Sequence, residues 1–272
     1  MNISFEFFPA KTEDGAAKLR QTRIELAARK PEFFSVTFGA GGTTQDGTLN
    51  TVLDIQASGH EAAPHLSCVG SSKANIRELL ARYKNNGIRR IVALRGDLPS
   101  GMLETGEFRY ASELVSFIRQ ETGDHFFIEV AAYPETHPQA KSPAADVDAF
   151  VHKVQCGANS AITQYFYNAD AFLYFRDQVR QRTDIPLIPG IMPITNYSQL
   201  ARFSDACGAE LPRWIRNRLQ HCGDDREAIK AFGLDVVSAL CERLIREGVE
   251  GLHFYTMNNS QPTLAILDRI AD

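Results

Sequence analysis

Three observations predict that this chain folds as an eightfold β/α (TIM) barrel. Short β-rich runs alternate with longer helical patterns along the chain, which is typical of repeated βαβ units around a parallel sheet. Eight such runs occur, and the distances between their first residues are 30, 30, 26, 37, 34, 26 and 65. The length of 272 residues is close to the ~250 typical of this fold. The long last interval predicts extra helices inserted between strands seven and eight.

The predicted strands can be placed in chain order. They begin near Ile3, Phe33, Ala63, Arg89, Phe126, Ser160, Pro186 and Gly251. A helical pattern follows each strand, and the insertion before the last strand ends in an amphipathic stretch, DREAIKAFGLDVVSALCERLIREG, whose terminal Gly248 is a plausible helix C-cap. An open doubly wound sheet is the alternative, because eight strands alone do not distinguish a closed sheet from an open one.

Composition places the chain among ordinary globular proteins. Hydrophobic residues at 44% and charged residues at 23% exclude disorder and coiled coil. The net charge is −4 and no basic block occurs, so nucleic acid is not an expected partner. The absence of a signal peptide and of ~18 consecutive apolar residues predicts a cytoplasmic protein without a membrane partner. No linker divides residues 1–272, so a single domain is expected, and its five scattered cysteines are expected to be reduced.

The first predicted strand carries a carboxyl group that should face the barrel interior. Side chains alternate across a strand, so Ser4 and Glu6 share one face while Phe5 and Phe7 occupy the other. The aromatic face should pack under the helices, which directs Glu6 inward. Burial in apolar surroundings favours the protonated form of a carboxyl group, which suits a general acid. Glu6 is therefore a catalytic candidate, and a buried glutamate paired with an arginine is the structural alternative.

The carboxyl ends of the other strands are rich in polar side chains. Active sites of β/α barrels lie at these ends. The candidates there are Thr37, His65, Arg95, Gly96, Asp97, Tyr133, Glu135, His137 and Gln164.

A glycine-rich loop follows the second strand. Residues 39–42 read GAGG, but Thr44 stands where a dinucleotide fingerprint needs its third glycine. A tight turn with backbone amides near a ligand is favoured, and a structural turn is the alternative. No Gly-Lys-Ser/Thr motif occurs, which excludes a P-loop enzyme.

A metal site and a Schiff-base lysine are not expected. His65, His137, His253, Glu6 and Asp97 could converge, but the first strand lacks a His-x-His pair and no His-x-x-x-His pair occurs. None of the eight strand cores contains a lysine.

Eight motifs follow one another along the predicted strands. In chain order they are SFEFFP, SVTFGAGG, AAPHLSC, IVALRGDLP, AAYPETHP, AITQYFY, IPGIMPITN and HFYTMN. Together they resemble the methylenetetrahydrofolate reductase family, in its bacterial form that consists of the catalytic domain alone. The match spans nearly the whole chain. The family is a flavin-dependent barrel, which agrees with the fold predicted from the strand pattern.

The resemblance implies a ping-pong reaction. NADH or NADPH reduces FAD and leaves, and 5,10-methylenetetrahydrofolate then takes its place and becomes 5-methyltetrahydrofolate. By motif, Glu6 matches the family's general acid, which protonates the folate so that its five-membered ring opens to an iminium ion. Asp97 matches an aspartate near flavin and pterin, whose negative charge favours the cationic intermediate.

The resemblance also implies binding residues. Those matching flavin contacts are Phe38, Ala40, His65, Arg95, Gly96, Asp97, Ala111, Tyr133, His137, Ala140, Asp146, His152 and Lys153, of which Lys153 would neutralise the pyrophosphate. Those matching nicotinamide or folate contacts are Thr37, Gln164, Gln199, Phe203 and Asn259, with Phe203 as the stacking ring.

The chain departs from the family pattern at three positions. Ala149 and His152 stand where relatives often carry Asn and Arg, and Asn259 stands where a folate-contacting Arg is common. These departures concern contacts to the flavin phosphates and to the glutamate tail of folate.

Two rival functions stay open: a non-catalytic flavin- or folate-binding barrel, and a metal-dependent barrel hydrolase. A homo-oligomer is expected because the family's bacterial relatives are oligomers. The bacterial resemblance favours NADH over NADPH as the electron donor.

Overall fold

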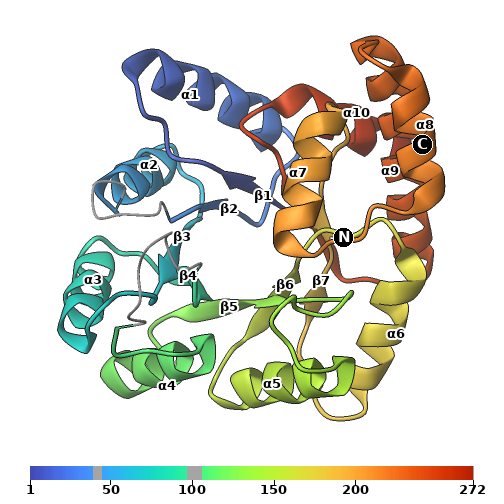
Figure 1. Ribbon diagram of the computed structural model, residues 1–272. Coiled ribbons are helices and arrows are strands. Elements are labelled where there is room, and N and C mark those ends of the chain that lie inside the picture. Colours follow the sequence, from blue (N-terminus) through green and yellow to red (C-terminus); the bar gives the residue numbers. More distant parts are fainter. Residues whose placement is uncertain (39–44, 97–105, 272) are drawn as a thin grey trace.

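The computed structural model describes residues 1–38, 45–96 and 106–271. Within them, nine parallel strands form a nearly closed barrel surrounded by helices (Figure 1). The strands are β1 (Asn2–Phe7), β2 (Phe33–Val36), β3 (Ala62–Ser67), β4 (Arg90–Leu94), β5 (Phe127–Ala132), β6 (Ser160–Thr163), β7 (Leu187–Ile188), β8 (Gly190–Ile191) and β9 (Gly251–Tyr255). Their order in the sheet is β7-β6-β5-β4-β3-β2-β1-β9-β8. The predicted barrel class is confirmed.

Helices follow the strands around the barrel. They are α1 (Glu13–Ala27), α2 (Gln45–Ala57), α3 (Lys73–Asn85), α4 (Ala111–Thr122), α5 (Pro143–Gln155), α6 (Ala169–Arg180), α7 (Tyr197–Cys207), α8 (Arg213–Cys222), α9 (Arg226–Arg246) and α10 (Ser260–Ala271). Polar side chains cap several N-termini by accepting first-turn N–H groups, among them Thr12, Ser72, Ser142 and Asn196. No helix in the described residues has the length and apolar character needed to cross a membrane.

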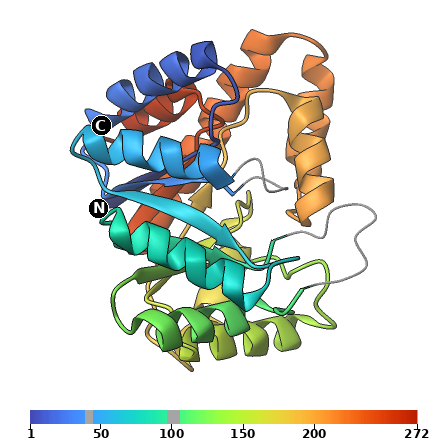
Figure 2. The same cartoon turned by 90° about the vertical axis from the view of Figure 1, so that its left-hand side faces the viewer.

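The long interval before the last strand holds three helices, α7, α8 and α9. Helix α7 lies on the side of the barrel toward which the strands run, beside the strands' carboxyl ends (Figure 2). A helix placed there can contribute side chains to a site at the mouth of the barrel.

The barrel closes at a strand that is interrupted by a proline. Pro189 separates β7 from β8; β7 pairs with β6, whereas β8 pairs with β9. Proline has no N–H to donate to a ladder, although its carbonyl oxygen accepts the His253 N–H at 2.9 Å. The next residue must be glycine, because a Cβ on Gly190 would lie 2.1 Å from the Thr163 carbonyl oxygen. The single seventh strand predicted from sequence is therefore observed as two short ones.

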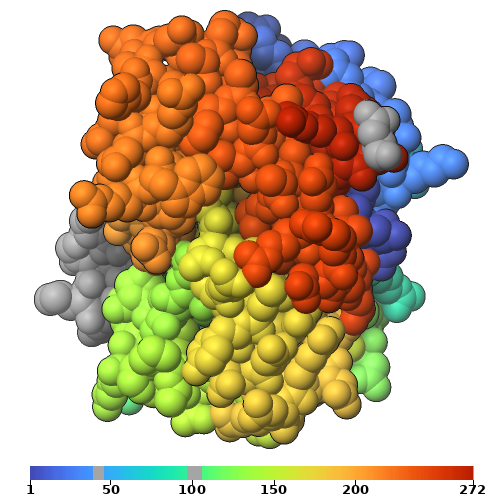
Figure 3. Space-filling model, turned by 90° about the vertical axis from the view of Figure 1, so that its right-hand side faces the viewer, coloured from blue at the N-terminus to red at the C-terminus, as the bar shows by residue number. Residues whose placement is uncertain are grey.

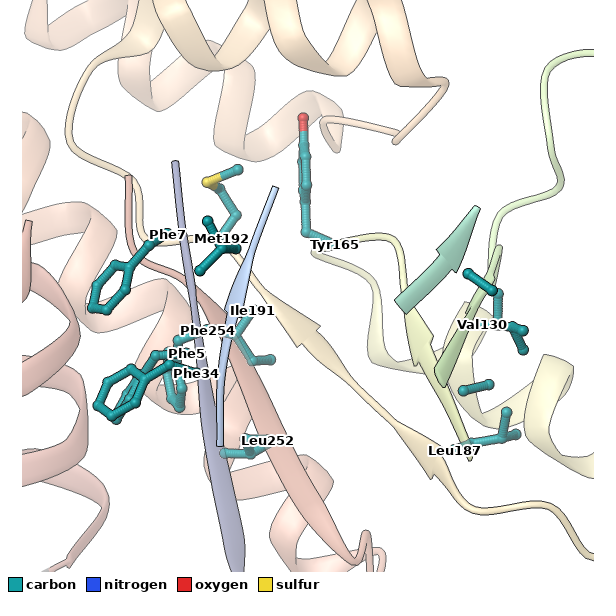
Figure 4. Close-up of a cluster of buried hydrophobic side chains, with 14 of the residues drawn as sticks. Phe5, Phe7, Phe34, Val130, Tyr165, Leu187, Ile191, Met192, Leu252 and Phe254 are labelled. Atoms are coloured by element: carbon teal, nitrogen blue, oxygen red, sulfur yellow. The ribbon is translucent and has the colours of Figure 1, made fainter. Parts of the chain in front are cut away.

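Aromatic packing under the helices fixes which face of β1 points inward. Phe5 and Phe7 are fully buried, and Phe5 packs against Phe34 and Phe254 at ring distances of 5.7 and 6.1 Å (Figure 4). These rings fill the layer between strands and helices. The opposite face of β1, which carries Glu6, therefore faces the interior, as the alternation of side chains predicts.

An arginine closes the amino end of the barrel. The Arg90 guanidinium, with only 9% of its side chain exposed, lies between the rings of Phe33 and Phe127, 4.4 and 4.2 Å from their centroids. It makes ion pairs of 2.5, 3.1 and 2.6 Å with Glu32, Glu61 and Glu129. Burial raises the pKa of Glu129, and the Arg90 charge opposes this rise. This end of the interior is filled by paired charges and rings.

Candidate active site

Three titratable side chains meet inside the carboxyl end of the barrel. Glu6, from the end of β1, has 12% of its side chain exposed. Its Oε2 lies 3.5 Å from Nε2 of His65 on β3 and 4.0 Å from Nε2 of His253 on β9. Both imidazole nitrogens are buried and have no hydrogen-bond partner among the described residues. A carboxyl group with two nearby but unsatisfied nitrogens is suited to exchange a proton with a group that enters between them.

The two histidines differ in how they are held. His253 Nδ1 shares a hydrogen bond of 2.7 Å with Ser4 Oγ, which fixes the ring. Burial lowers the pKa of His65, the Glu6 charge opposes this and the His253 charge adds to it. His65 is therefore a neutral imidazole at neutral pH, and it leaves the Glu6 carboxyl without a permanently cationic neighbour on that side.

Tyr255 is the register partner of Glu6 on the neighbouring strand β9, and Gln164 directly follows β6. The Tyr255 hydroxyl donates to the Thr163 carbonyl oxygen at 2.7 Å, and burial raises the pKa of Tyr255 well above its ordinary value. The Tyr255 hydroxyl is therefore uncharged at neutral pH. The Gln164 side-chain oxygen accepts the backbone N–H of Tyr165 at 3.0 Å, so its amide N–H groups are the ones left for a ligand. At the end of β2, Thr37 is held by its backbone, which donates to the Phe7 carbonyl oxygen at 2.9 Å.

The loop after β5 orders two predicted flavin contacts. The rings of Tyr133 and His137 pack edge to face at 4.5 Å. The His137 backbone N–H donates to Asp146 Oδ2 at 2.8 Å, and the Ala140 N–H donates to the His137 carbonyl oxygen at 2.8 Å. Asp146 therefore shapes this loop, a role that its motif match did not predict.

Lys153 approaches the same region from α5. Its Nζ donates to the Ala131 carbonyl oxygen at 2.5 Å. Burial lowers the pKa of Lys153 to about 8, and the charge of Asp146 opposes this shift. An ammonium has three N–H donors. Since the described residues pair one of them, the other two are left for an anion.

A glycine at the end of β4 is required by the protein itself. Gly96 has φ +83°, and a Cβ there would lie 1.9 Å from Ser67 Oγ. Ser67 Oγ in turn donates to the Arg95 carbonyl oxygen at 2.9 Å. The two remaining predictions in the loops, Ala40 and Asp97, lie outside the described residues.

Helix α7 carries two predicted substrate contacts. Gln199 and Phe203 are four residues apart and so share one helix face. Phe203 is half-buried against the core, and the Arg202 guanidinium lies 5.7 Å from its ring centroid. These side chains come from the element beside the mouth, not from a barrel strand.

Four further predicted residues lie at the ends of strands and helices or on a helix. Asn259 is exposed, and its side-chain oxygen accepts the Gln261 N–H at the start of α10, so it serves as a helix cap. His152 is exposed on α5, with Nε2 3.9 Å from Cys156 Sγ. Ala111 is the first residue of α4, and Phe38 follows β2. No described group of three or more His, Cys, Asp and Glu side chains is arranged to hold a metal ion.

Comparisons with known proteins assign the chain to a family. The family model described as methylenetetrahydrofolate reductase matches residues 1–271. The 5,10-methylenetetrahydrofolate reductases of Pectobacterium carotovorum subsp. carotovorum and Escherichia coli (strain K12) are each 42% identical to the chain, over 98% of it and 89% of their own length. The chain belongs to the methylenetetrahydrofolate reductase family.

Other relatives are longer or more distant. A probable methylenetetrahydrofolate reductase (NADH) of Oryza sativa subsp. japonica is 38% identical over 97% of the chain, which covers 47% of that protein. Among solved structures, an uncharacterized protein from Clostridium thermocellum that binds two copies of 5-methyl-5,6,7,8-tetrahydrofolic acid matches 99% of the chain and 93% of its own, with a TM-score of 0.70 and 14% identity. This likeness supports the barrel fold.

The described residues whose motifs match flavin contacts have a chemistry that fits a flavin nucleotide. Among the described residues Lys153 has N–H donors left for a phosphate, and the Tyr133 and His137 rings stand on the adjoining loop. The sequence motifs did not single out Ser4, whose hydroxyl orients His253. Its position on the Glu6 face of β1 was the signal that could have found it, because residues two apart on a strand share a face.

Proposed function

We propose that the chain catalyses FAD-dependent reduction of 5,10-methylenetetrahydrofolate to 5-methyltetrahydrofolate with NADH, by a ping-pong mechanism. Family membership supports reduction of methylenetetrahydrofolate. The single observation that carries the chemical step is the inward Glu6, 3.5 Å from the buried and unsatisfied Nε2 of His65.

Glu6 supplies the proton in this proposal. Opening the folate ring needs a proton on the departing nitrogen, and a carboxyl group inside the mouth can deliver it while water is excluded. Because burial lowers the pKa of His65, this imidazole is neutral at neutral pH and does not form a permanent ion pair with Glu6. His253, held by Ser4, limits where the carboxyl group can turn.

Other residues bind and orient. When bound, the flavin supplies the hydride chemistry, which no protein side chain can perform. Lys153 would pair with its phosphates, and Tyr133 and His137 would contact it from the β5–α5 loop. Gln164 would present its amide N–H groups to the nicotinamide or the pterin, and Phe203 would stack on the same planar ligand from α7. Asp97, from its motif, would favour the cationic folate intermediate.

NADH is the proposed donor. The bacterial resemblance favours it, and the plant relative is named as NADH-dependent. Comparing the rates of flavin reduction by NADH and by NADPH tests this choice directly, and a strong preference for NADPH would overturn it.

The colour of the purified protein tests the proposal as a whole. We expect an oxidised-flavin absorption band, present on purification or acquired on adding FAD. Under anaerobic conditions NADH should bleach it, and 5,10-methylenetetrahydrofolate should then restore it. A protein that takes up no flavin contradicts the proposal. A protein that bleaches with NADH but is not recoloured by the folate is a flavin binder without the second half-reaction.

A further inference from the structure

A carboxylate that the proposed chemistry does not use joins two parts of the mouth. Glu135, in the loop after β5, accepts the backbone N–H of Glu210 on its Oε2 at 2.7 Å. Glu210 belongs to the connection between α7 and α8 (208–212). The bond therefore links the loop that carries Tyr133 and His137 to the end of the helix that carries Gln199 and Phe203.

The same two segments also touch at a second point. Gly208, the C-cap of α7 with φ +74°, lies so close to Pro138 that a Cβ would be 2.5 Å from the proline Cγ. Figure 3 shows the orange surface that includes the α7–α8 region lying directly against the green surface of the region after β5. The β5–α5 loop and the α7–α8 connection are therefore packed together at two points.

Two energetically unfavourable features occur at Glu135 and its neighbour. Its Oε1 is buried without a hydrogen-bond partner among the described residues. The next residue, Thr136, has φ +74°, a left-handed conformation that costs a β-branched residue about 1–3 kcal/mol. Residues kept in such conformations are typical of functional sites, where the surrounding structure has to maintain them.

The outer side of the connection is solvated. Residues 208–211 line an open groove of about 460 Å³ together with Ser204, Asp205, Arg213 and Arg216. The Ala209 and Leu211 side chains, on either side of Glu210 in the sequence, are buried. The Glu135 carboxylate supplies the partner for the N–H at this point.

We propose that Glu135 is a positioning residue that fixes helix α7 against the β5–α5 loop, so that Gln199 and Phe203 are held at the mouth of the barrel. This inference rests on the proposed function for its kinetic consequence. Its structural part, the docking of the α7–α8 connection, does not depend on any activity.

The charges around Glu135 determine how docking depends on pH. Burial raises the pKa of Glu135 to about 7; the Glu210 N–H opposes this shift and the Glu210 charge adds to it. Titratable groups near Glu135 on the packed elements include Tyr133, His137, Tyr165 and Cys207, and Asp205, Arg213 and Arg216 line the groove. Since docking favours the protonated acid, it weakens as pH rises from the ordinary glutamate pKa of 4.5 to about 7 and changes little above that.

Amide hydrogen exchange of the whole chain tests the docking. Compared at one pH, Glu135→Ala should speed exchange at Glu210 by about tenfold, because the acceptor of its hydrogen bond is lost. Glu135→Gln, which is always neutral and can still accept the N–H, should restore protection and exceed the wild type at pH 8. Glu210→Gln is the matched control: it keeps the backbone N–H and removes the charge that adds to the Glu135 shift, so exchange in α7 should be no faster than in the wild type.

Trp214 provides a second readout. It is the only tryptophan in the sequence, lies in the first turn of α8, and has 58% of its surface exposed. Acrylamide quenching of its fluorescence should increase in Glu135→Ala and return toward wild type in Glu135→Gln. Equal protection and equal quenching in wild type and Glu135→Ala would overturn the proposal.

Kinetics then separate this inference from the proposed function. Glu135→Ala should raise KM for the folate and NADH more than it lowers kcat, with rescue by Glu135→Gln. If the docking changes as expected but no folate reduction is found in the wild type, the proposed function is wrong and the docking role of Glu135 is supported. If the wild type reduces folate and Glu135→Ala matches it in exchange, quenching and KM, only the docking role of Glu135 is wrong.

Discussion

The two ends of the barrel interior solve the problem of burying charge in opposite ways. At the amino end, Arg90 is paired with three carboxylates and covered by two aromatic rings. At the carboxyl end, Glu6 lies 3.5 and 4.0 Å from two imidazole nitrogens, both beyond good hydrogen-bond distance, and these nitrogens have no other partner in the described residues. Arg90 has a short ion pair with each of three carboxylates, although Glu129 Oε2 has no hydrogen-bond partner among the described residues, whereas Glu6 has no contact as short as these with either histidine.

The difference indicates which end contributes more to the free energy of unfolding. A buried ion network with short contacts holds strands together, and removing one member leaves buried charges uncompensated. A buried polar group without a partner costs free energy, and such groups persist where a ligand or a reaction uses them. The amino end is therefore expected to govern folding and the carboxyl end to govern chemistry, and the four predictions below test that division.

The largest effect is expected for Glu6→Gln. A general acid contributes typically ~10²- to 10⁴-fold to its step, and Glu6 donates only to the folate in our proposal. Flavin reduction by NADH should stay near the wild-type rate, while oxidation by methylenetetrahydrofolate should fall by that factor in stopped flow. The free energy of unfolding should change by less than about 1 kcal/mol, because no short contact of Glu6 is lost. An equal loss in both half-reactions would mean that Glu6 holds the flavin site together.

Arg90→Ala should show the reverse pattern. Removing one partner of a buried ion pair costs about 3–5 kcal/mol, and urea unfolding at pH 8 should show a loss of this size. The loss should be smaller at pH 5, because protonation of Glu129, whose pKa burial already raises, removes the uncompensated charge. Lys230→Ala, which removes an exposed pair with Glu227 on α9, is the control and should cost at most about 0.5 kcal/mol. The division between the ends breaks down if Arg90→Ala is as stable as this control.

Lys153→Met tests a charge that lies beside the mouth and outside the barrel interior. A hydrogen bond to a charged group contributes about 1.5–3 kcal/mol, so the dissociation constant for FAD should rise roughly 10- to 100-fold. In the wild type, affinity should also fall as pH rises through and above about 8, since the ammonium loses its charge there. Titration of FAD fluorescence at several pH values measures both effects. A wild-type affinity that is flat from pH 7 to 10 argues against a role for this ammonium.

The smallest effect is expected from the titration of His65. Burial lowers its pKa in the folded state below the ordinary histidine value of 6.5, so the unfolded chain binds the extra proton first as the pH falls. Stability should therefore be fully present above about pH 6.5 and decline as the pH falls toward the folded-state pKa. Replacing His65 with Gln should remove that part of the slope in urea unfolding between pH 7.5 and 5.5. An unchanged slope would show that His65 does not titrate differently in the folded chain.

Much of the fold could be predicted because it depends on local patterns. Every predicted strand begins within one residue of an observed one, since a buried parallel strand is a short apolar run with clear limits. The split at Pro189 could not be predicted, because the run PLIPGI has the apolar pattern of one strand and the exchange of neighbours depends on how the barrel closes.

The site was predictable only in part. Alternation along β1 placed Glu6 inward, and the ordered motifs supplied most of the other candidates. The Arg90 network was missed because an arginine at a strand start looks solvent-exposed, and its partners at positions 32, 61 and 129 converge only once the register of three other strands is set. The helix-cap role of Asn259 and the loop-shaping role of Asp146 likewise depend on which backbone N–H lies within reach.

The hydrogen bond between Ser4 and His253 joins residues 249 positions apart. Synthesis releases a chain from its N-terminus, so Glu6 and His65 leave the ribosome long before β9 exists. Until then one edge of β1 has no neighbour, and His253 is absent from the mouth. A nascent chain that lacks β9 therefore also lacks the complete cluster of Glu6, His65 and His253. The cluster can form only after β9, which carries His253, has been synthesised.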